Sequence, residues 1–193
     1  MLNRLMHYLE GISWCREWKE RTYGYSVVNF APASNATDIL TISGADGVTV
    51  NIREVTISGV STNNSSLHLY AVKRSTVNLG GTDYTFTNSN FTQGASANDS
   101  ADQIGAKAVI KAYATNPTTL GAGILTYSKA NHFFPNVTTP NLVEEFLLDF
   151  NGEQCDPLVL RGAKESLAIN LSGQTIPVGL TLTINLMWTE ANN

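Results

Sequence analysis

The residue types that most often carry chemistry are few in this sequence and lie far from one another. The three histidines are His7, His68 and His132, and none has a cysteine or a carboxylate at the spacing that zinc ligands use. A histidine without such neighbours is a weak signal for a ligand or a catalytic base. Cys155 precedes Asp156, and a neighbouring carboxylate disfavours the reactive thiolate. The sequence therefore predicts no metal site and no activated nucleophile.

The acidic residues form no catalytic or ion-binding pattern either. Glu144 and Glu145 are adjacent in a predicted strand, so their side chains should point to opposite faces of a sheet. Asp99 and Asp102 could offer oxygen ligands to Ca²⁺, but the residues around them lack the pattern of an EF-hand loop. No glycine-rich phosphate-binding loop precedes a predicted helix. These observations indicate a protein that is not an enzyme and that needs no cofactor.

The composition instead favours contacts with other proteins. Charged residues make up 15% of the 193 residues, against roughly 25% in an average soluble domain. Thr, Asn, Ser and Gly replace them, and these residues favour strands and turns. A surface with few charges loses little free energy when another subunit covers it. The alternative is a β-rich domain without protein neighbours.

Several classes of protein are disfavoured by the charge and hydropathy of the chain. The net charge of −4 comes without a basic patch, which argues against a nucleic-acid partner. No apolar run approaches the roughly 20 residues of a membrane helix. Arg4, His7 and Glu10 interrupt the apolar residues near the start, so no signal peptide is predicted. Cys15 and Cys155 are predicted to be free thiols in a reducing compartment, which is typical of synthesis in a cytoplasm.

Residues 1–24 carry a helical pattern that the rest of the chain lacks. Their large apolar side chains at helical spacing are Leu2, Leu5, Met6, Leu9, Trp14 and Trp18. A segment this short does not fold alone, so it must dock on another surface. We predict that residues 1–35 form an arm and linker, partly helical. Its partner-binding residues are predicted to be Leu5, Leu9, Trp14 and Trp18, unless the arm packs on its own domain.

Residues 36–193 alternate short apolar runs with polar turns. The runs 48–52 and 55–57 alternate out of phase, which predicts a β-bulge near Arg53. The polar segment 75–103 is long for a loop in a compact domain and indicates a function or an insertion. With about eight to nine short strands and no long helix between them, the pattern predicts an all-β domain, an antiparallel β-sandwich or jelly roll.

Six stretches of this domain are the basis of a resemblance to a known group of proteins. They are Ala36-Thr-Asp-Ile-Leu-Thr-Ile-Ser-Gly44, Val-Lys-Arg-Ser at 72–75, Ala-Thr-Asn-Pro-Thr-Thr-Leu-Gly at 114–121, Pro157-Leu-Val-Leu-Arg-Gly162, Glu165-Ser-Leu-Ala-Ile-Asn-Leu171 and Leu-Met-Trp-Thr-Glu at 186–190. In this order they resemble a group of small β-rich structural proteins of bacteriophages and prophages. The resemblance covers residues 36–190, does not extend to residues 1–35 and brings no catalytic residues with it.

The resemblance implies a component of the virion, made in the host cytoplasm. Most concretely it implies a capsid decoration, or cement, protein that stabilises the shell through protein–protein contacts. Its partners would be other virion proteins, first of all the major capsid protein, and the analogy suggests a homo-oligomer, in particular a trimer. One alternative is a head–tail or tail-fibre component attached through the arm. Another is a glycan-binding β-sandwich, in which Tyr84, Phe86 and Phe91 could stack on sugars.

Overall fold

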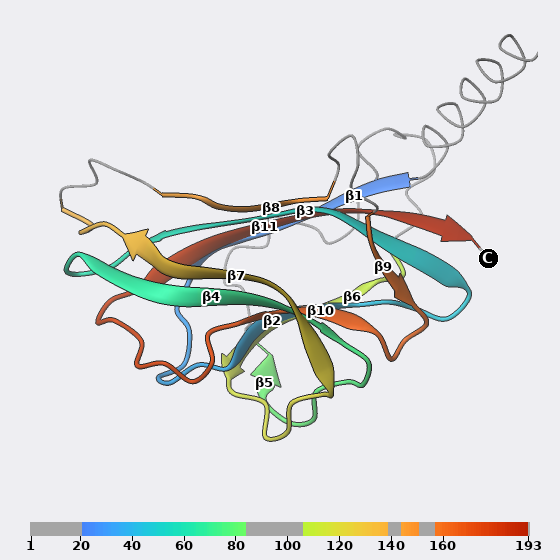
Figure 1. Ribbon diagram of the computed structural model, residues 1–193, viewed down its shortest axis with the longest axis horizontal. Helices are drawn as coiled ribbons and strands as arrows, with labels where there is room; N and C mark the ends of the chain where they lie inside the picture. The colour runs from blue at the N-terminus through green and yellow to red at the C-terminus, as the bar shows by residue number, and fades with distance from the viewer. Residues whose placement is uncertain (1–20, 84–105, 139–143, 151–156, 193) are drawn as a thin grey trace, which may run out of the picture.

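A computed structural model describes residues 21–83, 106–138, 144–150 and 157–192 of the chain. Every regular element within these residues is a β-strand, and the strands form two antiparallel sheets that lie face to face (Figure 1). The predicted all-β, antiparallel class is therefore confirmed. The described residues contain eleven strands, which is more than the eight to nine that the apolar runs predicted.

The first sheet has the strand order β1-β11-β3-β8, and β9 also pairs with β3. Its strands are β1 (Arg21–Phe30), β3 (Val48–Val60), β8 (Phe146–Asp149), β9 (Leu158–Arg161) and β11 (Thr181–Asn192). The short strands β8 and β9 pair with successive parts of β3, at residues 54–57 and 49–52. The last strand, β11, lies between β1 and β3.

The second sheet has the order β5-β6-β2-β10-β4-β7. Its strands are β2 (Asp38–Ser43), β4 (Ser65–Arg74), β5 (Thr82–Asp83), β6 (Val109–Thr115), β7 (Gly123–Phe134) and β10 (Ser166–Asn170). Strand β7 forms one edge of this sheet, and the short strand β5 lies at the other edge.

The core lies between the two sheets and is filled by alternate residues of the strands. From Leu180 to Trp188, every second side chain is buried, as expected of a strand with one face on the core. The buried indole of Trp188 stacks on the ring of Tyr23 in β1, with ring centroids 5.7 Å apart. This contact joins the two strands through their large aromatic surfaces.

The β-bulge predicted near Arg53 is present. Successive residues of β11 pair with Glu54 and then with Ile52, so Arg53 is an extra residue in β3. The extra residue changes the phase of the strand, and for this reason both Ile52 and Val55 are buried. The out-of-phase alternation in the sequence was therefore a correct signal.

The prediction that the β domain begins at residue 36 is wrong. Residues 21–30, which the sequence pattern placed in the arm and linker, form β1 and pair with β11 along the edge of the first sheet. Tyr23, Val27 and Phe30 are buried in the core. The strand forms because it covers the free edge of β11 and removes these three side chains from water.

Candidate functional site

Many of the residues singled out by the sequence lie outside the part of the chain that the structure describes, so their roles stay predictions. The four predicted partner-binding residues in this group are Leu5, Leu9, Trp14 and Trp18. The other residues in this group are His7, Cys15, Tyr84, Phe86, Phe91, Asp99, Asp102, Cys155 and Asp156.

The remaining candidate residues are described, and two of them lie close together: His132 Nδ1 is 3.8 Å from a carboxylate oxygen of Glu144. His68 lies in β4, His132 lies in β7, and Glu144 and Glu145 precede β8 instead of lying within a strand. Among the described residues, no group of three or more His, Cys, Asp or Glu could hold a metal ion. None of the described residues belongs to a helix long and apolar enough to cross a membrane.

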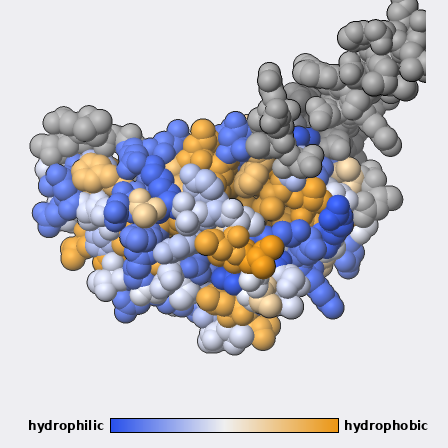
Figure 2. Space-filling model, viewed as in Figure 1, coloured by the Kyte–Doolittle hydropathy of each residue, from blue (hydrophilic) through white to orange (hydrophobic). Residues whose placement is uncertain are grey.

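A different feature, an uncharged surface, stands out where two loops meet the start of β7. Its two segments, 75–82 and 112–128, contain no Asp, Glu, Lys, Arg or His. Six of the twelve exposed large apolar side chains among the described residues belong to these segments, and they are 37–69% exposed. They are Val77, Leu79, Leu120, Ile124, Leu125 and Tyr127. We call the two segments the uncharged surface; Figure 2 shows apolar side chains over β7 and the loops below it.

A buried ion pair forms the base of this surface. Arg74, at the end of β4, donates to both carboxylate oxygens of Asp38, from Nε at 2.7 Å and from Nη2 at 2.6 Å. Asp38 is wholly buried and Arg74 is 6% exposed. Asn78 and Asn170 each donate a further hydrogen bond to the carboxylate, at 2.8 Å and 2.5 Å. Both oxygens therefore have two donors, which is what a buried charge requires.

The same arginine attaches the second loop to the sheet. Its Nη1 atom donates to the carbonyl oxygen of Gly121 at 2.6 Å. The amide of Gly121 donates to the side-chain oxygen of Asn78 at 2.9 Å, so Asn78 binds both the carboxylate and the loop. A Cβ atom at position 121 would lie 1.9 Å from the carbonyl oxygen of Thr76, so only glycine fits between the two loops.

Further hydrogen bonds join the two loops to each other. The amide of Ser75 donates to the carbonyl of Ala122 at 2.7 Å, and the amide of Leu79 donates to the carbonyl of Thr119 at 2.9 Å. The hydroxyl of Thr118 also donates to the carbonyl of Leu79, at 3.0 Å. The exposed Leu79 side chain therefore extends from a backbone that is fixed on both sides, which limits the entropy lost when a partner binds.

The other part of the uncharged surface is an irregular edge strand. No described strand pairs with the outer edge of β7. Its pairing with β4 shifts register twice, at Thr126 and again between Lys129 and His132. Thr126 Oγ1 donates to the carbonyl of Ala71 at 2.8 Å, which holds the first bulge in place. Bulges bend an edge strand and make it a poor template for an added strand. Contacts are therefore expected through the side chains of β7.

His132, near the end of the same strand, is in an apolar site. Its ring is wholly buried and lies edge-on to the rings of Phe134 and Phe146, with centroids 4.8 and 6.2 Å away. Neither ring nitrogen has a hydrogen-bond partner; the nearest carboxylate oxygen, of Glu144, is 3.8 Å from Nδ1. Burial, and secondarily the charge of Lys129, lowers the pKa of His132 from 6.5 to about 4, against an opposing effect of Glu144. The site therefore favours the neutral imidazole, which packs against the two phenylalanine rings.

This site predicts a loss of stability at mildly acidic pH. The imidazole of the unfolded chain takes up a proton as the pH falls below 6.5, whereas the folded one stays neutral until its pKa of about 4. The free energy of unfolding should therefore fall by about 3 kcal/mol over this interval. Urea denaturation at intervals from pH 7 to pH 4 measures it, and His132→Leu should remove most of this decrease. His68→Leu, at the partly exposed histidine, is the matched control and should retain it; an equal effect of both substitutions would contradict the assignment.

Comparisons with protein-family models, with curated proteins and with solved structures found no match to this chain. The uncharged surface and its ion pair are therefore interpreted from the geometry of this chain alone. The absence of charge from 75–82 and 112–128 was visible in the sequence. Nothing in the sequence indicated that hydrogen bonds between the two loops would join these segments in one surface.

Proposed function

We propose that this protein is a structural subunit of a bacteriophage particle, most concretely a capsid decoration (cement) protein. In this role it is not an enzyme, and it stabilises the shell through protein–protein contacts. The observation that carries the proposal is the uncharged surface, with six exposed apolar side chains on a base fixed by the Asp38–Arg74 ion pair. Exposed apolar side chains gathered in one place mark contact sites, and depletion of charge marks the centre of protein interfaces.

The order of the strands supports the same proposal through a jelly-roll arrangement. The series β1-β11-β3-β8 in one sheet and β2-β10-β4-β7 in the other alternates between the sheets as two interleaved Greek keys do. The strands β5 and β6 extend the second sheet beyond β2. Viral capsid domains use the jelly roll, and so do lectins and cupins, so the arrangement supports the virion role without deciding it.

The proposal assigns different contacts to the two parts of the chain. The partly helical arm attaches the subunit to another virion protein, in the first place the major capsid protein, through Leu5, Leu9, Trp14 and Trp18. The uncharged surface of the β domain contacts a further protein subunit. This division places the main energetic anchors on the two tryptophans, a residue type that is enriched among interface hot spots. It also places the protein in the virion, after synthesis in the host cytoplasm.

Purified particles provide the test of this function. Particles of the phage that encodes the chain are separated on a density gradient, and their proteins are quantified by mass spectrometry. We expect the protein in heads, in many copies per head, and we expect particles that lack it to lose their genome at a lower temperature. Recovery in tail fractions alone would favour the head–tail or tail-fibre alternative. Retention of the free protein on host cells, with none in particles, would favour the glycan-binding alternative.

A further inference from the structure

We propose that the partner of the uncharged surface is a second copy of this chain, related by a two-fold axis so that the two uncharged surfaces contact each other. This inference rests on the proposed function, because it names the subunit that the surface contacts. It departs from the trimer suggested by the decoration-protein analogy, since a two-fold contact is closed by two copies.

The charges around the surface indicate what kind of partner it accepts. Among the described residues, the charged groups next to its two segments are already paired: Lys129 with Glu144, Lys73 with Glu165 at 3.2 Å, and Lys111 with Asp83 at 3.5 Å. The two segments themselves carry no charge of either sign for a charged partner. A partner that brought charges to them would lose their hydration without receiving a counter-charge. The partner surface must be uncharged as well.

A second copy of the same surface meets this requirement at every position. In a two-fold contact each residue meets another residue of the same two segments, so no like charges are brought together. The loops at residues 61–66 and 172–179 are also free of charge, but Ser, Thr and Asn make up much of them, and only Val178 there is a large exposed apolar side chain. They would leave the apolar side chains of β7 and its loops poorly covered.

The size of the surface agrees with a complete interface. Of the 25 residues in the segments 75–82 and 112–128, 21 are at least partly exposed, which is comparable to one side of a standard protein interface of roughly 20–30 residues. Ile124 and Leu125 are 69% and 58% exposed at the start of β7. The loop that leads into β7 carries Leu120, and the loop hydrogen-bonded to it carries Val77 and Leu79. The bulges of β7 disfavour a sheet that continues from one copy to the next, so these side chains make the contact.

The test measures the mass of the whole chain in solution. Sedimentation equilibrium should give a dimer for the natural sequence. The double substitution Ile124→Glu with Leu125→Glu places four like charges at the interface, and we expect the dissociation constant to rise about hundredfold or more. The double substitution to lysine should have the same effect. An equimolar mixture of the two variants should recover the dimer, because opposite charges then meet across the two-fold axis. Val178→Glu, at a side chain 79% exposed on another loop, is the matched control and should remain dimeric.

The possible results separate this inference from the proposed function. A natural chain that stays monomeric at about 100 µM, or that forms a trimer, overturns the two-fold contact. If the glutamate variant then enters particles poorly, the surface contacts another virion protein and the proposed function stands. A dimer that the paired variants break and restore, from a protein absent from particles, would keep the inference and overturn the proposed function. Near-ultraviolet circular dichroism of each variant confirms that the β domain has folded.

Discussion

Replacing Arg74 with methionine is expected to lower the free energy of unfolding by about 3–5 kcal/mol, because it leaves the carboxylate of Asp38 buried without its counter-charge. Asp38 is wholly buried, and the two remaining donors, from Asn78 and Asn170, are neutral amides. The substitution also removes the hydrogen bond to the carbonyl of Gly121, so the loop it holds should loosen. Urea denaturation of the natural chain and the variant measures the difference.

The neighbouring residue gives a matched control for this prediction. Lys73 pairs with Glu165 at 3.2 Å, but the two side chains are 25% and 29% exposed, and such pairs contribute about 0–1 kcal/mol. Lys73→Met should therefore change stability little. The double substitution Asp38→Leu with Arg74→Met should recover part of the loss, since no unpaired charge remains buried. Equal losses for Lys73→Met and Arg74→Met would show that burial of the pair has no special effect.

Replacing both Trp14 and Trp18 with alanine is expected to abolish incorporation into particles while the β domain stays folded. Truncating an aromatic anchor in an interface costs about 2 kcal/mol or more. Two such losses weaken attachment by a factor on the order of a thousand, at about 1.4 kcal/mol per tenfold. The measurement is the number of copies per purified particle, compared with the thermal unfolding midpoint of the free protein.

The control for the arm keeps its length and net charge. Glu17→Ala with Lys19→Ala removes two polar side chains from the same segment and should leave incorporation unchanged. If the arm instead packs on its own domain, the double tryptophan variant should unfold at a lower temperature and still enter particles. That pair of results would reject the arm as the attachment site.

The class of fold could be predicted because the alternation of apolar and polar residues along a strand is visible within a short stretch of sequence. The β-bulge at Arg53 and the last strand were readable from which side chains are apolar within a short stretch of chain. The first strand is predicted as part of the arm because its apolar residues directly follow the helical pattern at the start of the sequence. Its place in the sheet is decided by pairing with β11 near the other end of the chain, where Arg21 lies opposite Glu190, and no local pattern contains that information.

The uncharged surface was less accessible to sequence reasoning for a similar reason. Asp38 and Arg74 are 36 residues apart, and Asn170 is 132 residues from Asp38. Only the order of β2, β10 and β4 in the second sheet brings them together. The sequence does indicate that the segment 75–103 is long for a loop. It could not indicate that the first residues of this segment are fixed to the loop before β7, because the hydrogen bonds that do so are mostly to backbone atoms.

The place of β11 has a consequence for how the protein is made on the ribosome. β11 contains residues 181–192, yet it is an inner strand that pairs with β1 on one side and β3 on the other (Figure 1). Neither of those strands can complete its pairing before β11 has been synthesised, because domains fold as units once their partner segments are present.

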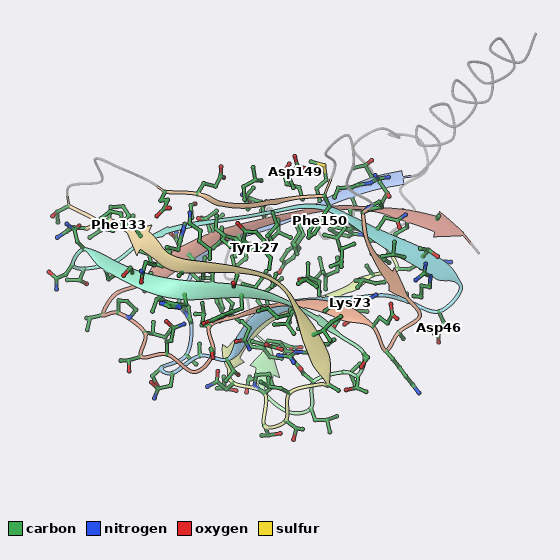
Figure 3. The ribbon with its side chains drawn as sticks, viewed as in Figure 1. Asp46, Lys73, Tyr127, Phe133, Asp149 and Phe150 are labelled. Carbon is green, nitrogen blue, oxygen red and sulfur yellow. The ribbon has the colours of Figure 1, made fainter. Side chains whose placement is uncertain are left out.

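A nascent chain that stops short of residue 181 lacks Leu182, Ile184, Leu186 and Trp188, whose side chains close the core against the second sheet, where β7 and Tyr127 lie (Figure 3). Chains that stop before residue 181 therefore leave exposed the apolar face that β11 covers, and exposed apolar surface of this kind is what chaperones and proteases act on. In this way the chain order of the strands delays completion of the core until residue 188 has been synthesised.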